Sequence, residues 1–207
     1  MRILLFGATG TIGSRIAAEA RERGHEVTGA TRSGKGGTLT ADASDVDTVA
    51  RLAAGHDAVV LAVAPPRDGI EASESLLEAG RGVLRGVRRA GVRRLVVVGG
   101  AGILEVSPGV RVVDAPGFPE DFLPRTLAQV ALFDLVRANA DDLEWTYLSP
   151  PVMVEPGERT GAYRTGDHRL LTDGEGNSRI STEDYAVALV DELQKGELTR
   201  RLAHVAY

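Results

Sequence analysis

Short apolar runs alternate along this chain with longer segments in which apolar residues recur every three or four positions. The short runs are typical of strands buried on both faces, and the longer segments are typical of amphipathic helices. Strands are predicted at residues 2–6, 26–30, 37–40, 57–63, 93–98, 144–148 and 201–207, with a short extended segment within 160–171. Helices are predicted at residues 11–23, 45–54, 69–90, 123–140 and 182–194. Glycines at positions 80, 82 and 86 lower the stability of the third helix, so we expect them to allow close packing against the sheet.

Strands and helices alternate almost throughout, and this order requires a parallel sheet with right-handed crossovers. The predicted fold class is therefore α/β, a doubly wound, mostly parallel sheet of the Rossmann type in three layers with a small C-terminal extension. The length of 207 residues fits a single domain over residues 1–207. A Gly- and Pro-rich stretch at about 99–121 and the region at about 150–181 interrupt the regular pattern. We expect these two segments to build the substrate side.

The first predicted strand leads into a glycine-rich turn at residues 7–13, with the sequence GATGTIG. A strand before the turn, a helix after it and a surrounding βαβ unit are the context of a dinucleotide-binding fingerprint. Gly7 permits the tight turn, Gly10 lets the backbone approach a pyrophosphate, and Gly13 lets the helix pack near the strand. The alternative is a tight turn without a ligand. The helix N-terminus favours a diphosphate, and the predicted contacts are Gly7, Thr9, Gly10, Thr11, Ile12 and Gly13.

The end of the second strand bears on which dinucleotide is bound. NAD enzymes usually have an acidic residue there, which holds the ribose 2′-hydroxyl. This chain has Arg32 and Ser33 instead, followed by Lys35, and an arginine suits a 2′-phosphate. NADP is therefore predicted, with NAD the less favoured cofactor. Asp42 is a further candidate, beside the adenine, although Arg32 and Lys35 as solvated charges and Asp42 as a helix-start residue remain open alternatives.

Composition narrows the remaining function classes. The chain is 43% apolar and 26% charged, as is usual for a globular protein, and its net charge of -5 offers no general attraction to nucleic acid. It has no cysteine, which excludes disulfides and cysteine nucleophiles. The apolar residues before Gly7 are too few for a signal peptide or a membrane span. We expect a cytoplasmic protein that binds neither nucleic acid nor membrane, as a monomer or a homodimer.

Several motifs resemble those of a known group of proteins. The turn at 7–13, the segment at 23–28 (RGHEVT) and Arg32 resemble the atypical short-chain dehydrogenases/reductases of the NmrA-like and biliverdin reductase B-like type. Residues 156–163 (PGERTGAY), 177–181 (NSRIS) and 184–186 (DYA) are similar to a bacterial branch described as NADH-flavin reductases. The first motif is shared by many functions, whereas the C-terminal motifs are more specific to this branch.

The resemblance implies an NADP-binding Rossmann fold that reduces a flavin, a quinone or a similar flat acceptor. By position it places Ala62, Val63 and Ala64 on the adenine-ribose side, and Gly99 and Gly100 near the nicotinamide. It also places Pro150, Pro151 and Val152, with Met153, over the nicotinamide ring. For the apolar members of this set, core packing is the alternative.

The sequence departs from the family at the expected catalytic positions. Typical members use a Tyr and a Lys four residues apart, but no pair here has that spacing, and Asp134 stands where the lysine is expected. Ala101 and Val152 replace the serine and histidine of the biliverdin reductase B-like relatives. No catalytic residue is therefore assigned. The four histidines have no ligand spacing, so no metal site is expected.

Two functions remain in view. The first is an NADPH-dependent reductase, because hydride transfer to a flat acceptor needs stacked geometry more than a side-chain acid. The second is a non-catalytic, NAD(P)-sensing regulator of NmrA-like type, because the catalytic pair is missing. A sugar-nucleotide epimerase is less favoured, since it needs the same pair.

Overall fold

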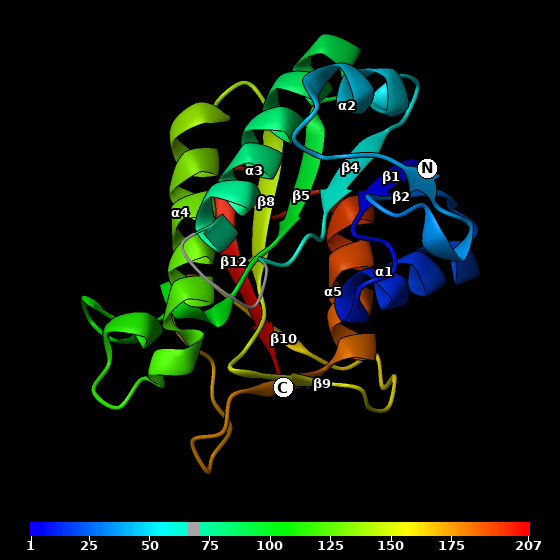
Figure 1. The fold of residues 1–207 in the computed structure, drawn as a ribbon. Helices are drawn as coiled ribbons and strands as arrows, with labels where there is room; N and C mark the ends of the chain where they lie inside the picture. Colours follow the sequence, from blue (N-terminus) through cyan, green and yellow to red (C-terminus); the bar gives the residue numbers. More distant parts are fainter. Residues whose placement is uncertain (66–70) are drawn as a thin grey trace.

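The structure is a computed structural model that describes the backbone of residues 1–65 and 71–207. Its centre is an eight-stranded sheet with the strand order β10-β12-β8-β5-β4-β1-β2-β3 (Figure 1). These strands are β1 (Arg2–Phe6), β2 (Glu26–Thr31), β3 (Leu39–Thr40), β4 (Ala58–Leu61), β5 (Arg94–Val98), β8 (Glu144–Ser149), β10 (Arg164–Gly166) and β12 (Arg201–Ala206). All neighbours pair in parallel except β10 and β12, so the predicted doubly wound, mostly parallel Rossmann sheet is confirmed.

Five helices cover the two faces of this sheet within the described residues. They are α1 (Thr11–Glu22), α2 (Val46–Ala53), α3 (Glu71–Ala90), α4 (Leu123–Asn139) and α5 (Thr182–Lys195). Helix α1 packs against α5 on one face, while α2, α3 and α4 form a row on the other, which gives the three predicted layers (Figure 1). The predicted start of the third helix at residue 69 lies outside the described residues. Each face has its own apolar core, one under α2–α4 and one under α1 and α5.

The connection order creates a crevice beside β1. From β1 the chain moves outward to β2 and β3, then returns to β4 on the other side of β1 and continues to β5. Loops after β1 and β4 therefore leave the sheet in opposite directions, and open α/β sheets bind ligands at such a switch point. The crevice lies at the carboxyl ends of the strands.

The glycines of α3 do pack closely, but against the neighbouring helices and the loop before α2 rather than against the sheet. A Cβ on Gly86 would lie 2.4 Å from the Val49 side chain of α2, and a Cβ on Gly80 would lie 2.5 Å from Leu132 of α4. A Cβ on Gly82 would lie 2.3 Å from the carbonyl oxygen of Ala43. The expected partner was wrong because α3 is the middle helix of its layer, flanked on both sides.

The irregular segments are more structured than the sequence indicated. The stretch at 99–121 contains 3-10 turns at Ala101–Ile103, Val112–Asp114 and Glu120–Phe122, and a hairpin of β6 (Glu105–Ser107) and β7 (Val110–Arg111). The C-terminal extension contains β9 (Met153–Glu155) and β11 (Arg179–Ser181), which pair in parallel outside the main sheet. Predicted strand 57–63 is shorter, at Ala58–Leu61, because the chain leaves the sheet there and residues 62–63 line the crevice. Predicted strand 37–40 is shorter, at Leu39–Thr40, because a 3-10 turn at Lys35–Gly37 precedes it.

Candidate functional site

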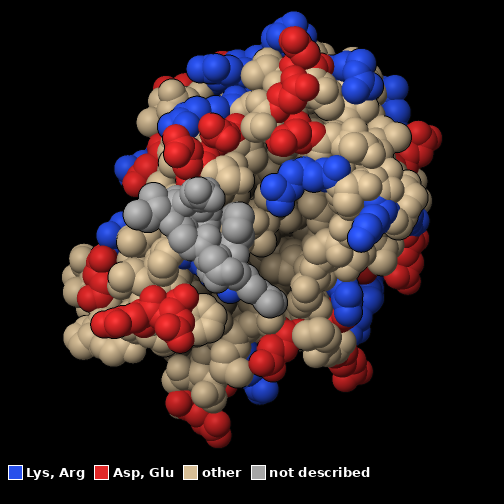
Figure 2. Space-filling model, in the orientation of Figure 1, with Lys and Arg blue, Asp and Glu red and all other residues tan. Residues whose placement is uncertain are grey.

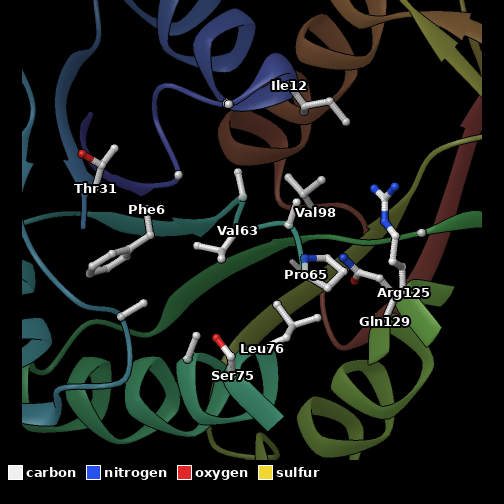
Figure 3. Close-up of a pocket in the computed structure, with 18 of the residues that line it drawn as sticks. Phe6, Ile12, Thr31, Val63, Pro65, Ser75, Leu76, Val98, Arg125 and Gln129 are labelled. Atoms are coloured by element: carbon white, nitrogen blue, oxygen red, sulfur yellow. The ribbon is translucent and has the colours of Figure 1, made fainter. Parts of the chain in front are cut away.

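A cavity of about 780 Å³ opens along the carboxyl ends of the central strands. Ile12 borders it on one side, Ser75 and Leu76 on the other, Thr31 at one end, and Arg125 with Gln129 at the opposite end (Figure 3). The space-filling view is hollowed at the centre of this face, with Lys and Arg side chains along one rim (Figure 2). The cavity is long and open, as a site for an extended ligand requires.

The glycine-rich turn lines one side of the cavity near its middle. Gly7 has a φ of +82°, and a Cβ there would lie 2.3 Å from the carbonyl oxygen of Ala62. Gly13 lies equally close to its neighbour, since a Cβ there would be 2.1 Å from the carbonyl oxygen of Gly7. Gly10, by contrast, borders open space apart from that same carbonyl, 3.3 Å from its Cβ position. Two glycines thus allow packing inside the protein, and the third leaves the backbone accessible.

The first turn of α1 presents free donors to this space. Gly10 occupies the N-cap position without a side-chain hydrogen bond, and no acidic residue lies in the first turn. Within residues 1–65 and 71–207, the first amide of α1 that bonds to a carbonyl is that of Ser14, whose partner is Gly10. The preceding amides and the positive end of the helix dipole therefore face the cavity, an arrangement that fits a diphosphate.

The end of the cavity beside β2 is built by a glycine-rich loop. The Thr31 hydroxyl accepts a hydrogen bond from the Gly34 amide at 3.0 Å and lies 2.7 Å from the Thr38 hydroxyl. These contacts fix the loop that carries Arg32 and Ser33, and both residues line the cavity with exposed side chains. Arg32 forms no ion pair with a described residue. Its guanidinium is thus available to an anion.

Asp42 lines the cavity and also holds its own loop. Its Oδ1 accepts hydrogen bonds from the Ser44 amide at 2.9 Å and the Ser44 hydroxyl at 2.8 Å. The helix-start role belongs instead to Asp45, which accepts hydrogen bonds from the amides of Asp47 and Thr48 at the beginning of α2. Asp42 therefore remains a candidate for contact with a ligand.

The opposite end of the cavity lies between β5 and α4. A Cβ on Gly99 would lie 2.3 Å from the Tyr147 ring, and a Cβ on Gly100 would lie 3.4 Å from the Gln129 side chain. The Ser149 hydroxyl donates to the carbonyl oxygen of Gly100 at 3.1 Å. Glycines after β5 thus let α4 approach the end of the sheet, and this end of the cavity is narrow and rigid.

Most of the predicted site residues meet in this cavity. The following line it: Gly7, Thr9, Gly10, Thr11, Ile12, Gly13, Arg32, Ser33, Asp42, Ala62, Val63, Ala64, Gly99 and Gly100. Pro150, Pro151 and Val152 are not among the lining residues. Both prolines are buried, while Val152 is 56% exposed, because the chain turns from β8 toward β9 at this point.

Sequence reasoning missed the contribution of the helices. Phe122, Arg125, Thr126 and Gln129 line the cavity from the start of α4, and Ser75, Leu76, Glu78 and Ala79 line it from α3. The α4 residues have the spacing i, i+3, i+4 and i+7 of a single helix face. That spacing was visible in the sequence, but the substrate side was assigned to the segments before and after this helix.

The four tyrosine hydroxyls all bond to other groups of the protein, and no tyrosine is among the residues that line the cavity. Tyr147 donates to the carbonyl oxygen and side chain of Gln129, and Tyr185 donates to the carbonyl oxygen of Leu148. Tyr163 donates to Asp191, and Tyr207 donates to Asp184. Burial raises the pKa of both Tyr147 and Tyr185. No tyrosine is therefore placed to give a proton to a ligand in the cavity.

The C-terminal motifs build a buried polar cluster rather than the cavity wall. Asp184 is fully buried and accepts hydrogen bonds from the Thr160 hydroxyl at 2.6 Å and the Gly161 amide at 2.7 Å. Ser181 caps α5 by accepting a hydrogen bond from the Asp184 amide at 2.9 Å. Burial alone would raise the pKa of Asp184, but the hydrogen bonds led by that of Thr160 lower it. These motifs thus stabilise the C-terminal extension.

Charged contacts tie α1 to the C-terminal part of the chain. Arg159 donates two hydrogen bonds to Glu19, at 2.7 and 2.8 Å, and Arg23 pairs with both Glu19 and Asp191. Arg15 pairs with Glu183 at 3.1 Å. The hydrogen bond from Arg159 is the main reason that the pKa of Glu19 lies below its ordinary value. Helix α1, which offers its amides to the cavity, is therefore held firmly along its length.

In the described part of the chain, no group of three or more His, Cys, Asp or Glu side chains is arranged to hold a metal ion. His204 is buried inside β12, and its Nδ1 lies 3.0 Å from the carbonyl oxygen of Ser149. Burial lowers the pKa of His204. None of the described helices has the length and hydropathy that crossing a membrane needs.

Comparison with known proteins gives consistent matches over nearly the whole chain. The NAD(P)H-binding family matches residues 7–195. The uncharacterised Bacillus subtilis (strain 168) protein YwnB is 36% identical in an alignment that covers 95% of this chain and 94% of that protein. A Burkholderia pseudomallei structure, described as a candidate exported protein, is 44% identical, with 100% of both chains covered and a TM-score of 0.91. A Streptococcus pneumoniae structure, described as a candidate NADH-flavin reductase, is 33% identical, covering 100% of this chain and 99% of that one, with a TM-score of 0.87.

Proposed function

Because this chain belongs to the NAD(P)H-binding family of atypical short-chain dehydrogenases/reductases, as its motifs predicted, we propose that it is an NADPH-dependent reductase of a flat acceptor such as a free flavin or a quinone. The observation that carries this proposal is one continuous cavity that joins the free amides of α1 to Arg32 at one end and to α4 at the other. The name of the Streptococcus pneumoniae relative supports the same class of acceptor.

The residues of the cavity suit an extended dinucleotide. The amides before Ser14 would hold the pyrophosphate, and Arg32 with Ser33 would hold the 2′-phosphate of NADP. Ala62, Val63 and Ala64 would border the adenosine side, while Gly99 and Gly100 would leave room for the nicotinamide beside α4. Bound NADPH would supply a hydride, and the acceptor would take the accompanying proton from water. The protein's own part is to bind and orient the two reactants.

The missing acid fits this chemistry. Every tyrosine hydroxyl is engaged inside the protein, and the titratable residues among the described lining are Arg32, Asp42, Glu78 and Arg125. A carbonyl substrate would need a side-chain proton donor, whereas a flavin or quinone accepts a hydride without one. The cavity therefore favours flat redox acceptors over alcohol or ketone substrates.

The test is the loss of NADPH absorbance with a panel of flavins, quinones and dyes, with NADH as the parallel cofactor. We expect turnover with at least one flat acceptor and faster turnover with NADPH than with NADH. Turnover with none of them, in protein that binds NADPH by calorimetry, would contradict the reductase proposal.

The same observation keeps a second function in view, a sensor of the dinucleotide that performs no chemistry. It is favoured by the engaged tyrosine hydroxyls, which leave the cavity without a proton donor. A sensor would bind NADP and NADPH with similar affinity and would retain a protein partner in pull-down. Steady-state turnover would exclude it.

The cytoplasmic location predicted from composition remains part of the proposal, although the Burkholderia pseudomallei relative is named as exported.

A further inference from the structure

The acceptor end of the cavity contains a cation that the proposed function has not used. Arg125 and Gln129 lie on one face of α4 and line the cavity, together with Phe122 at the N-cap position of that helix. The Arg125 side chain extends from α4 into the cavity, toward the side that Ile12 borders (Figure 3). Its side chain is half-buried, so its charge faces the interior of the site rather than the open surface.

Among the described side chains, Arg125 differs from the arginines that pair with a carboxylate because it has no such partner. Within residues 1–65 and 73–207, ten arginines pair with a carboxylate, among them Arg137 of the same helix, which lies 3.1 Å from Asp134. Arg125 has no hydrogen bond or ion pair with any side chain of residues 1–65 or 73–207. A half-buried guanidinium that no described carboxylate holds is disposed to pair with an anion that enters the cavity.

The 2′-phosphate of the dinucleotide is too far away to be that anion. Arg32 follows β2, whereas Gly100 and α4 follow β5, and the strand order places β1 and β4 between them. Three strand spacings of about 4.8 Å separate the two ends of the cavity by roughly 14 Å. Arg125 therefore lies with the nicotinamide and the acceptor.

Phe122 adds an apolar surface to the same end. Its ring is 54% exposed although it lines the cavity, and it stands one helical turn before Arg125. An exposed aromatic ring offers a flat surface for stacking, and a guanidinium offers a forked donor for a phosphate or carboxylate. Together they match a molecule that is flat at one part and anionic at another.

We propose that Arg125 selects an anionic acceptor, so that a flavin carrying a phosphate, such as FMN, is preferred to riboflavin and to neutral quinones. This inference rests on the proposed reductase function and names the substrate class of the same site. FMN and riboflavin share one ring system and differ by the phosphate, so they form a matched pair of probes.

The experiment measures flavin binding to the protein saturated with NADP, by quenching of flavin fluorescence, so that no turnover is needed. We expect FMN to bind at least about tenfold more tightly than riboflavin, equivalent to about 1.4 kcal/mol. Higher salt should weaken FMN binding and leave riboflavin binding unchanged. Arg125→Gln should reduce FMN affinity to the level of riboflavin, and Arg125→Lys, which keeps the charge, should restore part of the preference.

Arg85→Gln is the control, because it removes the same charge from an exposed position of α3 outside the cavity. It should leave the preference for FMN intact. Equal binding of FMN and riboflavin to the unmodified protein would overturn the role of Arg125. A loss of NADP affinity in Arg125→Gln as large as its loss of FMN affinity would also overturn this role, since Arg125 would then serve the dinucleotide.

A second pair of probes separates failure of this inference from failure of the proposed function. A naphthoquinone with an ionised group and its neutral parent should show the same order of affinity as the flavins. If all four compounds are bound and reduced alike, the reductase function stands and the anion preference falls. If none is bound or reduced although NADP binds, the reductase proposal falls and takes this inference with it.

Discussion

Three glycines of one short turn have three separate physical roles. Gly7 adopts a positive φ, Gly13 lets α1 approach the turn, and Gly10 leaves the backbone accessible from the cavity. Only the last of these concerns a ligand. The same residue type thus serves chain geometry, packing and binding within seven positions, which is why the motif needs its flanking strand and helix to be informative.

Arg32 is the residue whose change tests the choice of cofactor. We expect Arg32→Asp to weaken NADPH binding by about thirtyfold, roughly 2 kcal/mol, because a charge-assisted contact to phosphate is lost. NADH has no 2′-phosphate, so its affinity should change little. Calorimetric titration of both cofactors checks this. Arg85→Asp makes the same charge change outside the cavity and should spare both affinities, whereas equal binding of NADPH and NADH by the unmodified protein would contradict the NADP proposal.

At the scale of the elements, the sequence predicted what depends on local pattern. Apolar periodicity located each helix and most strands. The strand and the helix that flank the turn at 7–13 identified it as a dinucleotide-binding fingerprint. The sequence did not predict that α4 would line the cavity, since the approach of Gln129 to Gly100 is a contact between segments far apart in the chain. Nor did it place Val152, because the turn from β8 toward β9 depends on pairing with β11.

The cap of α5 is a test of what the C-terminal motifs do. Ser181→Ala removes the acceptor for the Asp184 amide and the donor to the carbonyl oxygen of Glu158. We expect the free energy of unfolding to fall by about 1–2 kcal/mol, the upper part of the range for a lost N-cap. Urea unfolding measures it. Ser107→Ala, at an exposed position of β6, is the control, and an equal effect of the two substitutions would show that the cap contributes nothing.

At the scale of the whole molecule, stability depends on carboxylates in the ion pairs between α1 and the C-terminal part of the chain. The hydrogen bond from Arg159 is the main cause that lowers the pKa of Glu19 below its ordinary 4.5. A group with a lowered pKa stabilises the fold above its unfolded value and loses that contribution as the pH falls. We therefore expect stability to decline below about pH 4.5, and unfolding at a series of pH values will measure it.

Arg159→Gln separates this effect from general acid unfolding. The variant should be less stable than the unmodified protein at pH 7, and the difference should shrink as the pH falls and Glu19 becomes protonated in both proteins. Arg89→Gln breaks an ion pair with Asp47 in which both side chains are mostly exposed, so it should change stability by less than about 1 kcal/mol at any pH. A difference between Arg159→Gln and the unmodified protein that does not vary with pH would exclude Glu19 as the cause.

The ion pairs between α1 and the C-terminal part of the chain also bear on how the protein folds during its synthesis. Arg15, Glu19 and Arg23 find their partners more than a hundred residues later in the chain. During synthesis the glycine-rich turn leaves the ribosome early, yet the residues that steady its helix emerge last. In a nascent chain the glycine-rich turn and α1 would therefore lack these contacts until α5 is released and packs beside α1.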